Sequence, residues 1–192
     1  MEFFLQWSKT STDLEETDAE DDVLVRPAIK NRAAFAPLYK RYVVRVYRYV
    51  YSRVGNVAEA EDLTAQVFED AINSLTKYRS QGTFAGWLFT IAYRRCADYH
   101  RRPKTGIISE KLSGEFFSDP LEQVIHQENF RRLDKLLSEL KEEERELLRL
   151  HFASRLTYRQ IAQVLRRSEG AIKVAMSRLI QKLKSRWEAE NE

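Results

Sequence analysis

Cysteine is almost absent from this sequence of 192 residues, and its single copy, Cys96, excludes an internal disulfide. Three histidines are too few and too scattered to predict a zinc site. No apolar run approaches the roughly 20 residues that a membrane-spanning helix needs, and the first residues lack the basic start of a signal peptide. These absences predict a soluble cytoplasmic protein that binds no metal or other cofactor.

Glycine and proline are scarce as well, with six and four copies. Architectures built from strands and tight turns use more of both residues, so their scarcity, together with 32% charged residues, favours helices. Hydrophobic residues make up 43% of the chain, which is enough to bury a core. The length allows one medium domain or two small ones. The composition therefore predicts an all-α fold.

The modest net charge of +3 hides an alternation of charge along the chain. Residues 1–26 have eight acidic and two basic side chains, whereas residues 27–102 have thirteen basic and six acidic ones. Residues 155–186 carry nine lysines and arginines against one glutamate. This density of positive charge indicates a polyanionic partner, most simply nucleic acid, although a solvated helix surface has the same composition.

Apolar residues at helical spacing predict two helical blocks. The first block runs from about residue 31 to 102 and contains three helices. Gly55 ends the first of these as a left-handed cap, Asn56 and Glu59 open the second as a capping box, and the third carries Phe84 and Trp87 in its apolar stripe.

The predicted organisation is two small helical domains, residues 27–102 and 121–187, joined by a flexible linker. The linker is assigned to residues 103–120, which contain several serines and glycines and little helical pattern. Residues 1–26 are acidic and lack sustained periodicity, which predicts a disordered tail. Residues 188–192 are assigned to a short C-terminal tail.

The second block contains the pattern of a helix-turn-helix. Thr157 and Gln160 predict a capping box at the start of a short helix, and Ser168 predicts the cap of a longer basic helix. The outward residues of the longer helix can reach base edges in a DNA major groove: Glu169, Gly170, Lys173, Val174, Ser177, Arg178 and Gln181. Three arginines lie where phosphate contacts are expected: Arg159, Arg166 and Arg167. An ordinary helical hairpin is the alternative.

Residues 78–102 interleave aromatic and basic side chains. The rings are Tyr78, Phe84, Trp87, Tyr93 and Tyr99, and the cations are Arg79, Arg94, Arg95, Arg101 and Arg102. Proteins bind single-stranded nucleic acid in this way, with rings that stack on bases and cations that follow the backbone. Packing in the core is the alternative, since Phe84 and Trp87 also fit the apolar stripe of the helix.

A polar and mostly acidic stripe follows the second helix of the first block, opposite its apolar residues. Its members, three and four residues apart, are Glu59, Asp62, Gln66, Glu69 and Asn73. By itself this stripe indicates either a solvated surface or a contact with a basic partner.

In this order the three features resemble the extracytoplasmic-function sigma factors of bacterial RNA polymerase. Residues 60–71, AEDLTAQVFEDA, are similar to the helix with which that family docks on the clamp of the largest polymerase subunit. The resemblance implies polymerase contacts from Asp62, Leu63, Gln66, Phe68 and Glu69. Ala65 and Gln66 replace the usual Gln-Glu pair, so one anionic contact is weakened.

The other two segments resemble the family's promoter-binding regions. Residues 78–102 are similar to the segment that melts and reads the minus-ten element, where the loop corresponding to residues 79–83 captures a flipped base. This implies minus-ten contacts from Tyr78, Arg79, Ser80, Gln81, Phe84, Trp87, Arg94 and Arg95. Residues 140–183 resemble the domain that binds the minus-thirty-five element, with contacts from Arg159, Arg166, Arg167, Glu169, Gly170, Lys173, Val174, Ser177 and Arg178. Arg166 stands where the family's turn commonly carries a glycine.

The implied function is that of a sigma factor, monomeric when free, which binds core RNA polymerase and directs promoter recognition, DNA melting and transcription initiation. The resemblance also implies an anti-sigma factor that inserts between the two domains. The alternative is a helix-turn-helix regulator that is not a polymerase subunit, but it leaves residues 78–102 and the acidic stripe unexplained. An enzyme lacks support, because the sequence has no glycine-rich phosphate loop, metal-ligand set or activated nucleophile.

Overall fold

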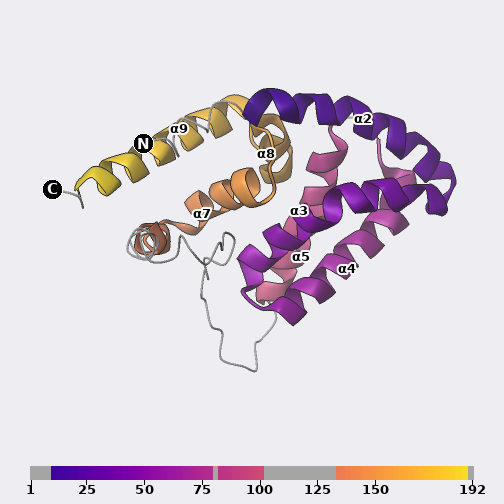
Figure 1. Cartoon of the computed structure of the whole chain (residues 1–192), viewed down its shortest axis with the longest axis horizontal. Coiled ribbons are helices and arrows are strands. Elements are labelled where there is room, and N and C mark those ends of the chain that lie inside the picture. Colours follow the sequence, from indigo (N-terminus) through magenta and orange to yellow (C-terminus); the bar gives the residue numbers. More distant parts are fainter. Residues whose placement is uncertain (1–9, 80–81, 102–132, 190–192) are drawn as a thin grey trace, which may run out of the picture.

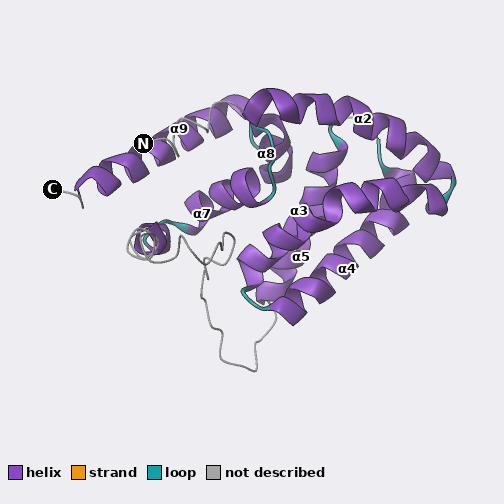
Figure 2. Cartoon of the chain, in the orientation of Figure 1, coloured by secondary structure: helices purple, strands orange, loops and turns teal. Residues whose placement is uncertain are grey.

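The computed structural model describes residues 10–79, 82–101 and 133–189, and within these ranges every regular element is helical (Figures 1 and 2). The first part comprises α2 (Thr10–Lys30), the 3-10 helix η2 (Arg32–Phe35), α3 (Ala36–Val54), α4 (Val57–Ser74), the 3-10 helix η3 (Leu75–Lys77) and α5 (Phe84–Arg101). The second comprises helical residues 133–138, α7 (Glu142–Leu148), the π-helical turn η4 (Arg149–Ala153), α8 (Tyr158–Leu165) and α9 (Glu169–Ala189). The predicted all-α fold is confirmed.

Helices α3, α4 and α5 pack against one another as a bundle. Pro37 lies in the first turn of α3, where a missing backbone N–H breaks no helical hydrogen bond. Gly55 ends α3 in the left-handed region with φ of 68°. The Asn56 side chain accepts a hydrogen bond from the N–H of Glu59 at the start of α4. These local signals place the helix boundaries where the sequence predicted them.

Aromatic rings fill the centre of this bundle. Tyr42 packs edge-to-face on Phe84, and Tyr49 packs edge-to-face on Phe89, with ring centroids 5.5 and 5.8 Å apart. All four residues are among the largest fully buried side chains, and such rings contribute strongly to core stability. Cys96 is 0% exposed in the same core, and burial raises the pKa of its thiol to about 12.

Helix α2 corrects the prediction of a disordered tail over residues 10–26. Its described side chains include Asp21, Val25 and Ala28, which lie on one face and are buried at 0%, 2% and 3% exposure. The Asp21 carboxylate accepts hydrogen bonds from the Tyr42 hydroxyl and from Arg41, both on α3. The stripe is too short and too acidic to stand out in the sequence, and α2 is held by partners that only the tertiary structure supplies.

The second module is built around the predicted helix-turn-helix. Thr157 and Gln160 form the capping box of α8, with hydrogen bonds of 2.9 and 3.2 Å. The Ser168 hydroxyl accepts a bond from the N–H of Ala171 in the first turn of α9. The core between the helices comprises Leu150, Leu156, Ile161, Ile172, Met176, Leu179 and Leu183. Both predicted caps are confirmed.

The two modules touch each other. Helix α3 contacts η4, and α5 contacts α8, while one end of α2 lies beside α8 (Figure 1). The predicted linker, residues 103–120, lies outside the described residues, as does the start of the predicted second domain up to residue 132.

Candidate nucleic-acid and protein interfaces

The outward face of α9 is open along its first turns. Gly170, Lys173, Val174, Ser177 and Arg178 are exposed, and Glu169 is half-buried. Lys173 Nζ lies 2.7 Å from Glu169 Oε1, but the two side chains are 58% and 42% exposed, so this ion pair is weak and can be exchanged for a DNA contact. The face therefore offers a cation, a guanidinium, a hydroxyl and an apolar group, which are the groups that read base edges.

The three arginines predicted to contact phosphates are all exposed: Arg159, Arg166 and Arg167. Arg166 follows α8 in the left-handed conformation, with φ of 53° and ψ of 44°. A residue with a Cβ pays free energy for this conformation, which explains why a glycine suits the position. At Arg166 the turn carries a solvent-exposed guanidinium instead.

The aromatic and basic side chains of residues 78–102 divide between the core and the surface. Phe84 and Tyr78 are 1% and 8% exposed, and their rings pack on each other with centroids 6.0 Å apart, so neither can stack on a base from its position here. Trp87 is half-buried beside them. The exposed cations are Arg79, Arg94 and Arg101, whereas Arg95 is hydrogen-bonded to Asp70 of α4. The predicted residues Ser80 and Gln81 lie outside the described residues.

The residues of α4 that were predicted to contact the polymerase divide between the surface and the core. Asp62 and Glu69 are exposed and Gln66 is half-buried, as a docking face requires. Leu63 and Phe68, however, are only 6% and 3% exposed and lie in the core. Their predicted role as polymerase contacts stays a prediction: Leu63 packs in the core, while Phe68 also lines the apolar groove between α3 and α4.

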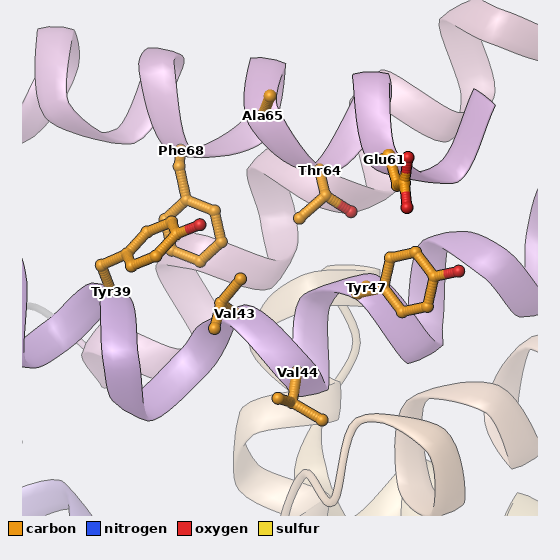
Figure 3. A pocket seen from close by; sticks show the side chains of 8 residues that line it. All are labelled: Tyr39, Val43, Val44, Tyr47, Glu61, Thr64, Ala65 and Phe68. Carbon is orange, nitrogen blue, oxygen red and sulfur yellow. The ribbon is translucent and has the colours of Figure 1, made fainter. Parts of the chain in front are cut away.

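An apolar groove of about 340 Å³ runs between α3 and α4 (Figure 3). Its lining residues are Tyr39, Val43, Val44, Tyr47, Glu61, Thr64, Ala65 and Phe68. Figure 3 shows Tyr39 and Phe68 reaching toward each other across the groove, with ring centroids 4.8 Å apart. Sequence reasoning missed this groove, although Tyr39, Val43 and Tyr47 form a second apolar stripe on α3 at a spacing of four residues.

A stripe of three residues on α3, which sequence reasoning also missed, reaches the second module. Arg45, Tyr49 and Arg53 are four residues apart and so share one helix face. The Arg45 guanidinium donates to the carbonyl oxygens of Ser154 and Arg155, at 2.8 and 2.9 Å. Arg155 lies in the short connection before α8 and has a left-handed conformation, with φ of 51°.

The other two residues of that stripe converge on Glu146 of α7. The Tyr49 hydroxyl and the Arg53 guanidinium each donate to this carboxylate at 2.5 Å. Burial raises the pKa of Tyr49, and the negative charge of Glu146 raises it further, so the hydroxyl remains a donor. The side chains of Glu146 and Arg53 are 5% and 10% exposed, which makes this a buried ion pair between the modules.

Neither a metal site nor a membrane-spanning helix finds support in the described ranges. No group of three histidine, cysteine, aspartate or glutamate side chains there could hold a metal ion. No helix among the same residues is long and apolar enough to cross a membrane.

Comparison with known proteins assigns both modules. The family profile for Sigma-70 region 2 matches residues 38–105, and the profile for Sigma-70, region 4 matches residues 130–183. The chain is 30% identical over 150 residues to the ECF RNA polymerase sigma factor SigM of Bacillus subtilis, a match that covers 77% of this chain and 91% of SigM. It is 32% identical over 157 residues to the ECF RNA polymerase sigma factor BldN of Streptomyces coelicolor, a match that covers 78% of this chain and 59% of BldN.

Two solved structures share the fold at 21% sequence identity. CnrH in complex with the cytosolic domain of CnrY superposes with a TM-score of 0.62, over 87% of this chain and 96% of CnrH. The sigma factor RpoE of Bartonella quintana, in complex with the anti-sigma factor NepR, superposes with a TM-score of 0.59, over 79% of this chain and 94% of RpoE. At this identity the likeness concerns the fold alone.

Proposed function

Because the chain belongs to the extracytoplasmic-function (ECF) sigma factors of RNA polymerase, we propose which of its surfaces serve promoter recognition and which serve assembly with the polymerase. As a sigma factor it acts in promoter recognition and transcription initiation. Sigma factors as a class are not enzymes. RNA synthesis accordingly remains the chemistry of the polymerase, in the cytoplasm, and this chain contributes binding and positioning.

The exposed face of α9 is the observation on which the proposed promoter contact rests. Lys173, Ser177 and Arg178 enter the major groove of the minus-thirty-five element and contact base edges, with Gly170 and Val174 allowing close approach. Arg159, Arg166 and Arg167 contact phosphates and fix the register of the helix on the duplex.

The loop before α5 and the surface of α5 serve the minus-ten element. Trp87 stacks on an unpaired base, while Arg79 and Arg94 follow the phosphates of the separated strand. Tyr78 and Phe84 support this surface from the core rather than contacting DNA themselves.

Helix α4 serves assembly with core polymerase. Asp62, Gln66 and Glu69 offer an exposed polar and anionic face, which suits a basic partner. The apolar groove between α3 and α4 adjoins this face, because Glu61 and Ala65 of α4 line the groove. We place the polymerase contact across both.

Besides core polymerase, we propose an anti-sigma factor as a protein partner of this chain. RpoE of Bartonella quintana, which shares this fold, was solved with the anti-sigma factor NepR. A regulator of this kind acts by covering surfaces that the polymerase or the promoter needs.

The test is reconstituted transcription with core polymerase on a promoter library. Lys173→Ala, Ser177→Ala and Arg178→Ala should each weaken specific promoter binding by about 1–3 kcal/mol, because each removes a base contact. Arg167→Ala should weaken binding to all sequences alike and reduce its salt dependence. Lys184→Ala, an exposed lysine further along α9, is the matched control and should bind like the wild type. If the three variants initiate like the control, α9 does not read the promoter.

A plain DNA-binding regulator predicts a different result. It would bind the selected duplex through α9 and yet fail to co-elute with core polymerase.

A further inference from the structure

The side chain of Gln163, on α8, inserts into a notch at the start of α5. The backbone N–H of Thr83 donates to Gln163 Oε1 at 3.0 Å, and Gln163 Nε2 donates back to the carbonyl oxygen of Thr83 at 3.4 Å. The amide orientation follows from this pairing, because the Thr83 N–H requires an acceptor. One planar carboxamide therefore pairs with the backbone donor and with the carbonyl oxygen of a single residue that is 6% exposed. The same carbonyl oxygen also accepts a hydrogen bond of 3.0 Å from the N–H of Trp87.

Two glycines form the walls of the notch. A Cβ at Gly82 would lie 2.5 Å from Gln163 Oε1, and a Cβ at Gly86 would lie closer still. Gly86 is buried within α5, where a glycine weakens a helix, so its presence there needs a packing reason. The close approach of the Gln163 carboxamide provides that reason.

The notch selects a chemical group rather than glutamine as such. It binds a flat group that carries an acceptor and a donor side by side. The pairing edges of DNA bases carry that pattern, and the loop that ends at Thr83 belongs to the surface proposed for the minus-ten strand. The edge of an unstacked base would therefore offer Thr83 the same kind of acceptor and donor as Gln163 does.

We propose that Gln163 fills this notch in the free chain as an internal mimic of a base edge, so that the closed chain and the minus-ten strand exclude each other. The proposal rests on the proposed function of the α5 surface. The contacts of Arg45, Tyr49 and Arg53 with the second module hold α8 in position over the notch.

The closed chain hides one DNA-binding surface and leaves the other open. The notch and the adjacent side of α5 are covered by α8, whereas Lys173, Ser177 and Arg178 of α9 remain exposed. A duplex can therefore be read by α9 before the chain opens, but a single strand cannot enter the notch.

The test measures closure directly with a pair of labels on the full chain. Ala58→Cys on α4 and Ala189→Cys on α9 replace exposed alanines. Cys96 stays unlabelled, because it is fully buried. Double electron–electron resonance measures the distance between the two spin labels. The labelled chain without further substitutions should give one narrow distance distribution.

Two variants should open the chain by different means, one by removing the carboxamide and the other by blocking the place it occupies. Gln163→Ala removes both hydrogen bonds to the Thr83 backbone, and Gly86→Ala places a methyl group where the carboxamide lies. Each should shift the ratio of open to closed chains by about tenfold or more and broaden the distribution. The double variant should open no further than Gln163→Ala alone, because the two changes act on one contact. Lys184→Ala, at an exposed position of α9 outside both proposed sites, is the control and should leave the distance unchanged.

Binding then distinguishes a mere packing contact from competition with a base. A labelled single strand of about 16 nucleotides, the upper site size of a small binding domain, should bind Gln163→Ala about tenfold more tightly than wild type. A duplex should bind both equally, since the face of α9 is open in both states. Circular dichroism should show unchanged helicity, and Gly86→Ala, which favours helix, guards against loss of fold.

Either of two results overturns the inference: wild-type distances in both Gln163→Ala and Gly86→Ala, or a single-strand affinity that does not follow opening. Failure of the proposed function would show itself differently, as wild-type protein that does not assemble with core polymerase although its distances respond to Gln163→Ala.

Discussion

At the scale of single residues, Glu146 joins the two modules most directly. Its carboxylate receives Tyr49 and Arg53 from α3, and it also lies 3.5 Å from Arg149 in the following turn. Glu142, one helical turn earlier, contacts Arg53 at 3.0 Å as well, but its side chain is 56% exposed. Both glutamates thus form an ion pair with Arg53, but Glu146 is buried and Glu142 is exposed to solvent.

This difference predicts unequal effects of the same substitution. Glu146→Ala leaves the buried Arg53 without its closest anion, and we expect the free energy of unfolding to fall by about 3–5 kcal/mol. Glu142→Ala should lower it by at most about 1 kcal/mol, because water screens an exposed pair. Urea unfolding followed by tryptophan fluorescence measures both. Equal losses would mean that depth does not set the strength of these contacts.

Arg166 combines a conformational cost with a proposed contact to DNA. It has φ of 53° without being a glycine. We expect Arg166→Gly to raise the free energy of unfolding by up to about 1 kcal/mol, because glycine adopts this conformation without strain. The same change should weaken DNA binding, because it removes a cation.

Arg167→Gly is the control for this prediction, since Arg167 has no positive φ. It should weaken DNA binding without any gain in stability. A gain in thermal midpoint for both variants would show that the left-handed conformation is not the cause.

At the scale of elements, the π-helical turn η4 holds a half-buried titratable ring, that of His151. His151 Nδ1 lies 3.0 Å from the carbonyl oxygen of Leu156, and the ring stacks on Tyr158 of α8 with centroids 5.2 Å apart. Burial lowers the pKa of His151 from its usual 6.5, and the hydrogen bond to Leu156 offsets this only in part. The neutral ring is therefore the form that the folded module favours.

This shift predicts a loss of stability in mild acid. The pKa of His151 is lower in the folded than in the unfolded chain, so its contribution is complete above pH 6.5 and is lost as the pH falls through the folded value. His151→Gln should flatten the dependence of the urea midpoint on pH below 6.5. His100→Gln, at an exposed histidine, should retain the wild-type slope. If His151→Gln also retains it, another group causes the dependence.

At the scale of the whole molecule, two surfaces serve different partners. Helix α4 serves the polymerase, and the side of α5 that α8 covers serves a single DNA strand. The acidic face of α4 is exposed in the closed chain, so assembly with polymerase does not require the modules to separate first. Entry of a single strand does require it. We therefore expect polymerase binding and opening to be separable steps.

Charge reversal on α4 tests the assembly step. Asp62→Lys with Glu69→Lys should abolish co-elution with core polymerase at moderate salt, while α9 still binds a duplex, because the anionic face becomes cationic. Asp22→Lys with Asp134→Lys changes the net charge equally at exposed positions elsewhere and should leave co-elution intact. Normal co-elution of the α4 variant would make its acidic stripe a solvated surface.

Most of the helices, and their caps, could be predicted from the sequence. Gly55, Asn56, Thr157 and Ser168 act through their own backbone neighbours, so their roles are readable from a few adjacent residues. The exposed face of α9 was predictable for a similar reason, since helical periodicity alone decides which residues turn away from the apolar stripe.

The sequence by itself thus determined the helical class, the two modules and the outward faces of α4 and α9, because these depend on local spacing and capping. Only the tertiary structure decided that acidic α2 is helical from Thr10, that Leu63 and Phe68 are core, and that Gln163 occupies the notch beside Thr83. Those outcomes rest on contacts between residues far apart in the sequence, such as Thr83 and Gln163, which are 80 positions apart. A buried carboxylate such as Asp21 or a carboxamide such as Gln163 is stable only where distant partners satisfy its hydrogen bonds, and no local pattern records those partners.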